Sequence, residues 1–491
     1  MTVHLVGAGP GDPGLLTVRG AQVLRSADVV VYDRLSIGTL LDLAPPDAER
    51  INVGKAPGHP TMPQEDINAL LVARGAAGQR VVRLKGGDPF VFARGGEEAL
   101  ALMAAGVPFE VVPGITSAIA VPAYAGIPVT QRHSSELFTV ITGHEDPDKG
   151  GELDWETVAK LGGTIIVMMG IGRLPKIVDR LLAGGLPPDT PAAAVRWGTR
   201  PEQHSVRATL GTILDHDLAS PSVIVIGKVA ALNLDWFESR PLFGRTVVVT
   251  RAREQASALV DLLRLQGADT VEVPVIRIAP PADGGAACRD AAARVASFDW
   301  VVFTSVNGVR GFMDELHDAR DLGGVRVAAI GPGTADALRD RNVVADLVPE
   351  RFVAESLLDA FPAPGAGGGR VLLARAAVAR DVLPDGLRER GWDVEVVEVY
   401  RTEPVPVGDH DRKAAADADV VTFTSSSTVD RYLEAMGDGA VPPIVACIGP
   451  VTAQTARDRG LTVDVEADVH TIEGLVDAVV AHLAGQPEGM R

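Results

Sequence analysis

The sequence predicts an α/β protein whose sheets are mostly parallel. Short runs rich in β-branched residues recur along the chain, and each is followed by a Gly-rich turn and a stretch with helical periodicity. Strands that alternate with helices of about 10–15 residues are typical of βαβ units, which pair their strands in parallel. The clearest predicted strands span residues 3–6, 29–32, 81–84, 165–168, 223–226, 247–250, 301–304, 325–330, 371–373, 420–424 and 444–448.

The composition fits several folded domains and disfavours some partners. The chain has 491 residues, of which 46% are hydrophobic and 22% charged, so about three or four domains are expected at roughly 150 residues each. Its formal net charge of −18 repels nucleic acid and anionic membranes. We therefore expect small-molecule ligands, no nucleic acid and no membrane. An anionic substrate needs a locally prepared site of backbone N–H groups, hydroxyls and a few Arg.

Cysteine and histidine usage predicts a cytoplasmic protein without a metal. Cys288 and Cys447 lie far apart, which favours two buried thiols in a reducing compartment. The N-terminus lacks a signal-peptide pattern, and no run of about 18 apolar residues predicts a membrane span. His133, His144 and His204 show no ligand spacing, so we expect no metal site.

The clearest domain junction is the segment Ser239–Arg245. It follows an apparent terminal strand and precedes a new strand, turn and helix, which places the main boundary near residue 243. We therefore expect one domain over 1–240 and another over 244–486. Residues 146–151 and the Gly-rich stretch 362–369 are softer connections.

The second half contains an internal repeat. The segment 298–309 returns at 418–429, 328–338 returns at 446–456, and 244–252 returns at 369–377, a separation of about 120 residues each time. Two copies of one α/β unit facing each other would form a cleft, and clefts between lobes are common small-molecule sites.

The first predicted strand runs into the Gly-rich turn Val6–Gly14 (VGAGPGDPG). Such a turn at a helix start can bind a nucleotide. The dinucleotide pattern fails here, because Asp12 stands where the third Gly belongs and Pro10 lacks an N–H. An NAD-dependent oxidoreductase is therefore disfavoured.

Further motifs follow in a characteristic order, and together they resemble the uroporphyrinogen-III C-methyltransferases of the tetrapyrrole methylase family over about residues 1–240. The motifs lie at 31–35, 53–55, 83–90 (RLKGGDPF), 92–98 (FARGGEE), 112–118, 124–130, 168–170, 197–199 and 221–227. The resemblance implies two α/β lobes, about 1–120 and 121–240, and a homodimer. It also implies two methylations at carbon that convert uroporphyrinogen III to precorrin-2.

The methyl donor implied is S-adenosyl-L-methionine. Gly86 and Gly87 allow a close backbone approach, and Asp88 can accept hydrogen bonds from a ribose or an ammonium. By resemblance, the donor contacts fall on Pro10, Gly86, Gly87, Asp88, Val91, Thr116, Ser117, Met169 and Gly198.

Proton transfer accompanies methylation at carbon. The resemblance puts the proton acceptor on Asp33 and the proton donor on Lys55. Asp33 could instead be a helix cap, and Lys55 a solvated surface residue or a holder of a substrate carboxylate. Two positions depart from the family pattern: Ala93 replaces a common Gly, and Gln131 replaces a common His in a segment expected to border the substrate.

The repeated turns of the second half place hydroxyls at helix starts. They lie at 303–308 and 423–428 (FTS turns) and at 330–335 and 448–453 (IGP turns). Ser and Thr there could simply cap helices, although helix N-termini also suit carboxylates. These turns, the opening GRTVVVTR and Val399–Thr402 resemble uroporphyrinogen-III synthases over about 244–485.

That resemblance implies two flavodoxin-like lobes joined by two extended strands, 273–280 and 399–405. The outer lobe would comprise about 244–276 plus 406–486, and the inner lobe about 278–400. The implied reaction needs no cofactor: hydroxymethylbilane loses water and closes into uroporphyrinogen III with its last pyrrole inverted.

Synthase site residues are also carried over. Tyr400 matches the family tyrosine proposed to assist loss of the hydroxyl, although it could be a core tyrosine. Substrate contacts are expected from Ser305, Thr334, Arg375, Ser425 and Thr452. The chain is thus expected to be a bifunctional enzyme of tetrapyrrole biosynthesis, on a route to siroheme, cobalamin or another product. The alternative is an active methyltransferase fused to a degenerate synthase that only binds or senses a tetrapyrrole.

Overall fold

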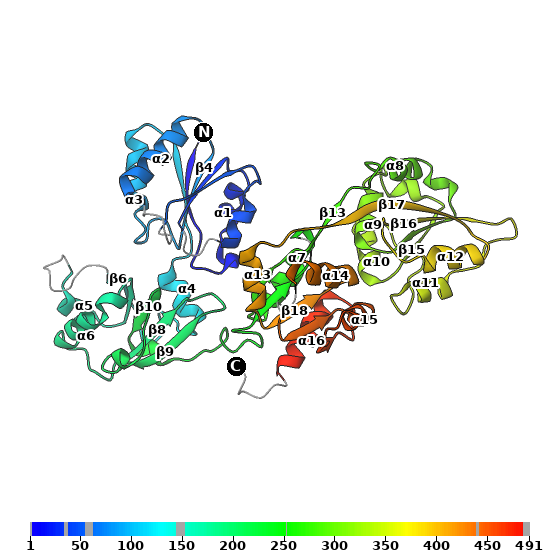
Figure 1. The fold of residues 1–491 in the computed structure, drawn as a ribbon. Helices are drawn as coiled ribbons and strands as arrows, with labels where there is room; N and C mark the ends of the chain where they lie inside the picture. Colours follow the sequence, from blue (N-terminus) through cyan, green and yellow to red (C-terminus); the bar gives the residue numbers. More distant parts are fainter. Residues whose placement is uncertain are drawn as a thin grey trace. The chain divides into compact units, whose positions relative to one another are not determined.

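The computed structural model describes residues 2–33, 38–54, 62–143, 153–251, 253–437 and 441–484. The chain forms two compact units (Figure 1). Unit 1 comprises Met1–Arg245 with Gln266–Asp269, and unit 2 comprises Thr246–Leu265 with Thr270–Arg491. Strands and helices alternate through both units, so the predicted α/β class is confirmed.

The first lobe of unit 1 is built on a parallel sheet of order β3-β2-β4-β1-β5. Val29–Val31 of β2 and Val81–Lys85 of β4 are buried throughout. Helices cover both faces of this sheet, which is why these strands read as continuous apolar runs. The elements are β1 Val3–Gly7, α1 Val18–Leu24, β2 Val29–Tyr32, β3 Glu49–Asn52, α2 Gln64–Ala76, β4 Val81–Lys85, α3 Gly95–Ala104 and β5 Phe109–Val112.

The second lobe of unit 1 departs from the parallel expectation. Its sheet has the order β6-β7-β10-β8-β9, and β10 runs antiparallel to both β7 and β8. A short connection joins β8 to β9 without a crossover helix, so these strands also pair antiparallel. The elements are α4 Ser117–Tyr124, β6 Phe138–Thr142, α5 Trp155–Leu161, β7 Thr164–Met168, α6 Leu174–Ala183, β8 Pro191–Arg196, β9 His204–Thr209 and β10 Ser222–Ile226.

Unit 2 contains two five-stranded sheets. The first has the order β12-β11-β18-β19-β20 and takes its strands from both ends of the unit. It is built from β11 Thr246–Val249, α7 Arg253–Leu265, β12 Asp269–Glu272, α13 Asp409–Ala416, β18 Val420–Phe423, α14 Ser426–Met436, β19 Ile444–Cys447, α15 Pro450–Asp458, β20 Val465–Glu466 and α16 Ile472–Ala484.

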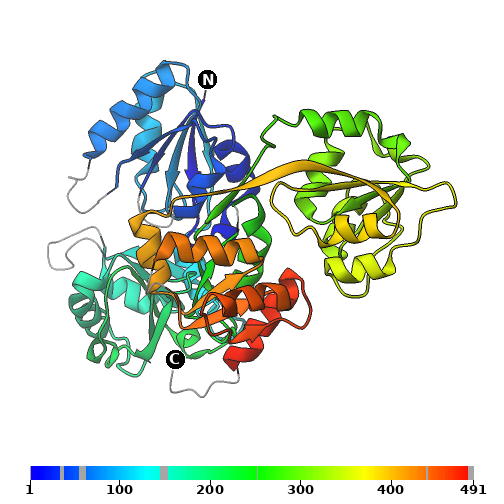
Figure 2. The ribbon, with the colours of Figure 1, turned by 45° about the vertical axis from the view of Figure 1, so that its right-hand side comes forward.

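The second sheet of unit 2 has the order β13-β17-β16-β14-β15. The chain enters it through β13 and leaves it through β17, and these two strands pair antiparallel (Figures 1 and 2). The elements are β13 Ile276–Ala279, α8 Ala286–Ala293, β14 Trp300–Phe303, α9 Val306–Met313, β15 Arg326–Ala329, α10 Pro332–Arg339, α11 Ala354–Ala360, β16 Arg370–Ala376, α12 Val382–Glu389 and β17 Asp393–Pro404.

The internal repeat corresponds to matching local construction. Helices α9 and α14 begin after Ser305 and Ser425, whose backbone angles are the same (φ −165°, ψ 157°). Helices α10 and α15 each begin with Pro after an extended Gly. The repeated FTS and IGP sequences therefore encode the same strand-to-helix turns.

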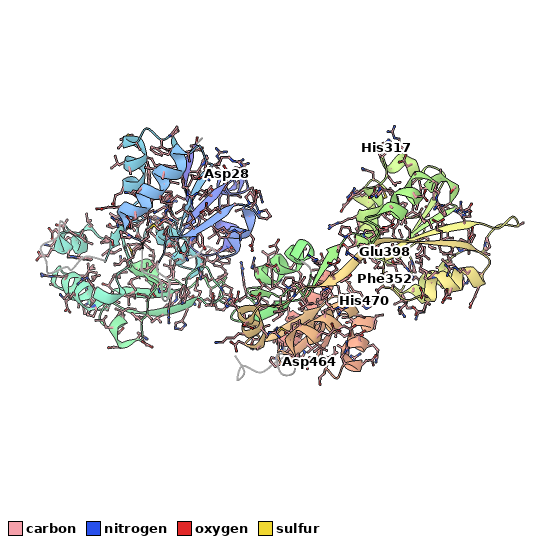
Figure 3. The ribbon with its side chains drawn as sticks, turned by 45° about the horizontal axis from the view of Figure 1, so that its top comes forward. Asp28, His317, Phe352, Glu398, Asp464 and His470 are labelled. Carbon is pink, nitrogen blue, oxygen red and sulfur yellow. The ribbon has the colours of Figure 1, made fainter. Side chains whose placement is uncertain are left out.

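Aspartates placed just before strands tie the ends of neighbouring strands together. Asp28 accepts the N–H of Arg80 at 2.8 Å, and Asp464 accepts the N–H of Val445 at 2.9 Å; both aspartates are labelled in Figure 3. Asp346 accepts the N–H of Val327 at 2.7 Å in the same way. Such bonds satisfy backbone donors at the sheet edge and fix where each strand starts.

Among the residues that the structure describes, no helix is long and apolar enough to span a membrane. The same described ranges hold no cluster of His, Cys, Asp and Glu that could bind a metal ion.

Candidate functional site

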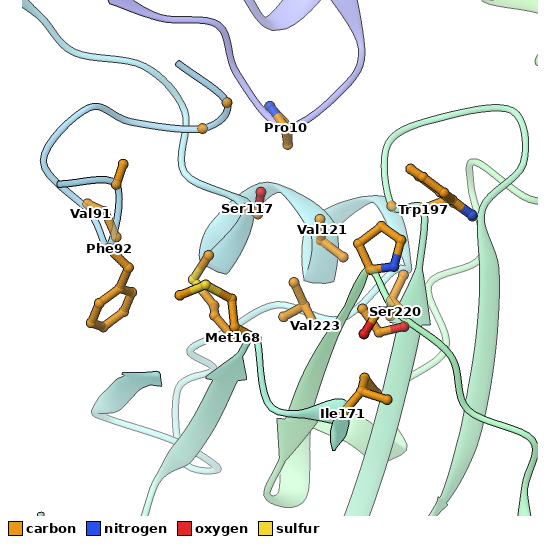
Figure 4. A pocket seen from close by; sticks show the side chains of 18 of the residues that line it. Pro10, Val91, Phe92, Ser117, Val121, Met168, Ile171, Trp197, Ser220 and Val223 are labelled. Atoms are coloured by element: carbon orange, nitrogen blue, oxygen red, sulfur yellow. The ribbon is translucent and has the colours of Figure 1, made fainter. Parts of the chain in front are cut away.

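Unit 1 contains a cavity of about 510 Å³, shown from close by in Figure 4. The first lobe lines it with the segments that follow the carboxyl ends of β1, β2 and β4, and the second lobe with the carboxyl ends of β7 and β8 and the start of the antiparallel β10. Ligands of open parallel sheets bind at such carboxyl ends. The cavity is lined by Pro10, Asp33, Lys85, Gly86, Gly87, Val91, Phe92, Ala93, Ser117, Val121, Met168, Met169, Ile171, Val195, Trp197, Gly198, Arg200, Ser220, Pro221, Ser222 and Val223.

Most of the predicted donor contacts therefore surround one space. Those that line it are Pro10, Gly86, Gly87, Val91, Ser117, Met169 and Gly198, and the predicted proton acceptor Asp33 lies among them. Lys55 falls outside the described residues. Ala93 lines the cavity, whereas Gln131 is exposed and bonds to Ser135 instead.

Two Gly-rich segments are tied to each other at the cavity. The N–H of Gly87 donates to the carbonyl of Gly9 at 2.7 Å, and the N–H of Gly9 donates to the carbonyl of Gly87 at 3.2 Å. Gly87 has φ +69°, a conformation that side chains disfavour. This pairing holds Pro10 beside Gly86 at the cavity wall.

Asp88 and Thr116 do not line the cavity. The Asp88 carboxylate accepts the N–H of Phe90 at 2.7 Å and that of Gly114 at 3.0 Å. Thr116 caps α4 by accepting the N–H of Ala118 at 3.3 Å. In this arrangement both side chains shape the segments around the cavity, and their predicted contact with the donor stays a prediction.

Asp12, the residue at which the sequence departs from the dinucleotide-binding pattern, fixes the position of the first Gly-rich turn. Its backbone N–H donates to the hydroxyl of Thr199 at 3.1 Å, and its carboxylate accepts the phenol of Tyr124 at 2.6 Å. Burial, and after it the Asp12 hydrogen bond, raises the pKa of Tyr124. Asp12 thus fixes the Pro10 turn against residues of the second lobe.

Several cavity residues have strained backbones. Phe92, Met169 and Trp197 have φ values of 52°, 54° and 50°, in the left-handed region that non-glycine residues rarely adopt. Such conformations cluster at functional sites, where the surrounding structure enforces them. Sequence reasoning selected Met169 but missed Phe92 and Trp197, although both lie inside quoted motifs.

Sequence reasoning also missed a buried charge cluster behind the cavity. Arg83, 2% exposed, donates to Asp33 at 2.8 Å and to Glu98 at 3.1 Å. Lys85 donates to the same Glu98 oxygen at 2.7 Å. Burial lowers the pKa of Lys85. The sequence does contain a pattern that indicates this cluster. Arg83 and Lys85 stand two residues apart in a buried strand, so both cations lie on the same face of the sheet.

In unit 2, the structure brings Tyr400 and Ser305 together. The phenol of Tyr400 donates to the Ser305 hydroxyl at 3.1 Å, while that hydroxyl accepts the N–H of Gly308 at 3.0 Å. Thr334 is buried in α10. Because β14 and β15 are parallel neighbours, the segments carrying Ser305 and Thr334 leave the same edge of the sheet.

The other predicted synthase contacts lie elsewhere in unit 2. Arg375 already pairs with Asp381 at 2.7 Å and donates to the carbonyl of Arg380 at 3.1 Å. Ser425 caps α14, and Thr452 is buried in α15. These two follow the parallel neighbours β18 and β19, so they repeat the placement of Ser305 and Thr334.

Comparison with known proteins gives two family matches that divide the chain. Residues 2–214 match the family described as Tetrapyrrole (Corrin/Porphyrin) Methylases. Residues 257–477 match the family described as Uroporphyrinogen-III synthase HemD.

Individual relatives match either nearly the whole chain or about half of it. A porphyrin biosynthesis protein HemD of Ruminiclostridium josui is 38% identical over 497 residues, which cover 97% of each chain. An S-adenosyl-L-methionine-dependent uroporphyrinogen III methyltransferase of Methanosarcina barkeri is 52% identical, over 47% of this chain and 92% of its own. A crystal structure of a Thermus thermophilus uroporphyrin-III C-methyl transferase with S-adenyl homocysteine is 40% identical, covers 47% of this chain and 98% of its own, and has a TM-score of 0.41.

Proposed function

Because the chain belongs to the family of tetrapyrrole-biosynthesis proteins that fuse a tetrapyrrole methylase to a uroporphyrinogen-III synthase, we propose that it performs two consecutive steps. The synthase closes hydroxymethylbilane into uroporphyrinogen III with inversion of the last pyrrole. The methyltransferase then adds two methyl groups to carbon and yields precorrin-2. We assign the methyltransferase to residues 1–240 and the synthase to residues 244–486.

The observation that carries the methyltransferase assignment is the cavity of unit 1. Its walls gather residues from eight separate motifs, and they combine Gly-rich backbone with apolar side chains such as Met168, Val195 and Val223. That chemistry suits a ligand with a flat ring at one end and a polar amino-acid end at the other. S-adenosyl-L-methionine, when bound, supplies an activated methyl group on a sulfonium sulfur.

The chain's own task in methyl transfer is to position groups and move protons. Donor and acceptor carbon must meet in line, so the rigid turns around Gly87, Met169 and Trp197 contribute by orientation. Asp33 is proposed as the proton acceptor, and its hydrogen bond to buried Arg83 fixes the carboxylate at the cavity wall. Lys55 is proposed as the proton donor.

The synthase needs a grip on carboxylates and help for a leaving hydroxyl. Helix starts with hydroxyls and N–H groups suit carboxylates, and Ser305, Thr334, Ser425 and Thr452 stand at such starts. Tyr400 is proposed to donate a hydrogen bond to the departing hydroxyl, a role that a neutral phenol can fill near neutral pH. The loss of water makes this step a lyase reaction.

We further propose that the enzyme works in the cytoplasm as a homodimer joined through unit 1. Apolar side chains stay exposed in its first lobe, including Leu100 and Met103 on α3, at 61% and 62% exposure. Exposed apolar residues of this size favour burial against a partner. Sedimentation of the wild type and of Leu100→Asp tests this, and a monomeric wild type would contradict it.

A two-substrate assay tests the function. The pure protein is given hydroxymethylbilane alone, and the uroporphyrinogen isomer is identified after oxidation. Only isomer I, the spontaneous product, would refute the synthase and favour a degenerate tetrapyrrole-binding domain. In a second reaction, uroporphyrinogen III and methyl-labelled S-adenosyl-L-methionine should give labelled precorrin-2, and the absence of label would refute the methyltransferase.

A further inference from the structure

The cavity of unit 1 contains a lysine that the proposed mechanism does not use. Lys85 is the last residue of β4, its side chain is 4% exposed, and it lines the cavity. An ammonium has three N–H donors. Within the part of the chain that the structure describes, Glu98 at 2.7 Å is the one acceptor found for them.

The carboxylate that holds Lys85 is itself shared. Oε1 of Glu98 also accepts Nε of Arg83 at 3.1 Å and the amide of Gln64 at 3.3 Å. Oε2 of Glu98 is buried and meets no hydrogen-bond partner among the described residues. One fully buried carboxylate therefore serves two buried cations, and an arginine and a lysine compete for the same oxygen atom.

The remaining charges leave the cavity wall positive. Its charged lining residues, as far as the chain is described, are Asp33, Lys85 and Arg200. Asp33 is paired with Arg83, and Lys85 with Glu98, which leaves the positive charge of Arg200 on the lining. Glu98 accepts one of the three N–H donors of Lys85, and burying the other two without acceptors costs free energy. In a protein of net charge −18, this cation points to an anionic group on a ligand.

We propose that Lys85 binds a carboxylate of a ligand in the methyl-transfer cavity, and that Glu98 is the positioning residue that holds the Lys85 ammonium in place. The inference rests on the proposed methyltransferase function. Two ligand carboxylates have the required chemistry: the amino-acid carboxylate of the methyl donor and the acidic side chains of the tetrapyrrole.

The first experiment replaces Lys85 by an apolar side chain of similar length. Lys85→Met leaves Glu98 bonded to Arg83 and Gln64. The matched control is Lys160→Met, because Lys160 is 69% exposed and pairs with Glu156 on the surface of α5. Affinity for S-adenosylhomocysteine is measured by calorimetry, and kcat and KM for uroporphyrinogen III are measured by label transfer.

Loss of a charged hydrogen bond should weaken one ligand by about 10- to 100-fold. Weaker S-adenosylhomocysteine binding identifies the donor carboxylate, and a raised KM for uroporphyrinogen III identifies the substrate carboxylate. Both values within about twofold of wild type would overturn the proposal. A wild type that binds S-adenosylhomocysteine but transfers no label would refute the proposed function, while the binding comparison still decides the role of Lys85.

The second experiment tests Glu98 through pH. Arg83 on β4, Glu98 on α3 and Asp33 after β2 act on the charge of Lys85, and Glu97 on α3 interacts with it as well. The Glu98 carboxylate raises the pKa of Lys85 and opposes the effect of burial. Glu98→Gln removes that charge, so Lys85 should lose its proton at lower pH and carboxylate binding should fall off at lower pH than in wild type.

The control for this variant is Glu156→Gln, a carboxylate that is 68% exposed and pairs with Lys160 on the surface of α5. Its pH profile should match wild type. Glu98→Gln could instead bind its ligands more weakly at every pH, with binding falling off at the same alkaline pH as in wild type. In that case Glu98 has only a structural role and the proposal is wrong. If Lys85→Met does not fold, the pH profile of Glu98→Gln tests the proposal on its own.

Discussion

Gly198 is the position in the cavity wall where one added methyl group should have a measurable effect. A Cβ at this position would lie 2.4 Å and 2.7 Å from the two γ-carbons of Val121. Ordinary contacts between carbons begin about 1 Å further out. Gly198 does not adopt the left-handed backbone, so Gly198→Ala adds a steric conflict with one side chain and no backbone strain.

The magnitude follows from the packing. Val121 is 4% exposed and sits in α4, so it cannot turn away without disturbing its neighbours. Inserting a methyl group into a packed region costs about 1–3 kcal/mol, which lowers Tm by about 2–4 °C per kcal/mol for a unit of this size. Ser117 at the start of α4 lines the cavity, so a displaced α4 should also weaken the binding of S-adenosylhomocysteine.

The assay is a double-mutant cycle with Val121→Ala. The unfolding transition of unit 1 is identified as the one that S-adenosylhomocysteine raises in temperature. Each single variant should destabilise, Val121→Ala by about 2 kcal/mol for its lost contacts. The double variant should be less destabilised than the sum, because Val121→Ala removes both γ-carbons that collide with the new methyl group.

The control is Gly96→Ala in α3, where an added Cβ meets nothing within 4 Å. That change should be neutral or slightly stabilising, because Gly weakens a helix relative to Ala. Strict additivity of Gly198→Ala and Val121→Ala, or a Gly198→Ala variant as stable as wild type, would refute the reasoning.

Three further predictions concern other parts of the chain. Tyr400→Phe should slow ring closure and leave methylation unchanged, and equal loss of both activities would contradict the separation into two enzymes. Asp88→Ala should lower the Tm of unit 1 by removing the acceptor of the Phe90 and Gly114 amides, at a cost of about 1–3 kcal/mol, whereas exposed Asp179→Ala should not. Burial raises the pKa of Cys288 to about 11 and of Cys447 to about 12. Iodoacetamide at pH 8 should therefore label both thiols only after unfolding. Rapid labelling of the folded protein would show that the thiols are accessible and would contradict this prediction.

Local sequence patterns predicted much of the fold. Val29–Val31 and Val81–Leu84 read as buried parallel strands because helices cover both faces of their sheet. The antiparallel direction of β10 was harder to predict, since its residues Val223–Ile226 are as apolar as those of the parallel strands. A buried strand looks the same in either direction, and only its pairing partners, Ala-rich β8 and apolar β7, determine which direction it takes.

The site was predictable where its residues belong to motifs and unpredictable where it depends on pairing. Pro10, Gly87 and Gly198, which are predicted to contact the methyl donor, line one cavity. The Glu98 cluster was not foreseen, because β4 and α3 supply its charges from separate segments. The role of Asp88 in holding the segments around the cavity was not foreseen either, because its oxygens accept the N–H groups of Phe90 and of the distant Gly114.

The repeat in unit 2 shows how identical local sequence can carry different chemistry. Ser305 and Ser425 have the same backbone angles and cap equivalent helices. Ser305 also meets the phenol of Tyr400, which comes from β17, 95 residues further along the chain. Within the described ranges, the neighbours of the Ser425 hydroxyl are Ser427 and Thr428 of its own helix. Because a helix cap satisfies backbone donors in either case, capping cannot distinguish the two serines. The phenol can distinguish them, and it supports the proposal that the hydroxyl departs at the sheet that carries Tyr400 and that the Ser425 turn holds substrate.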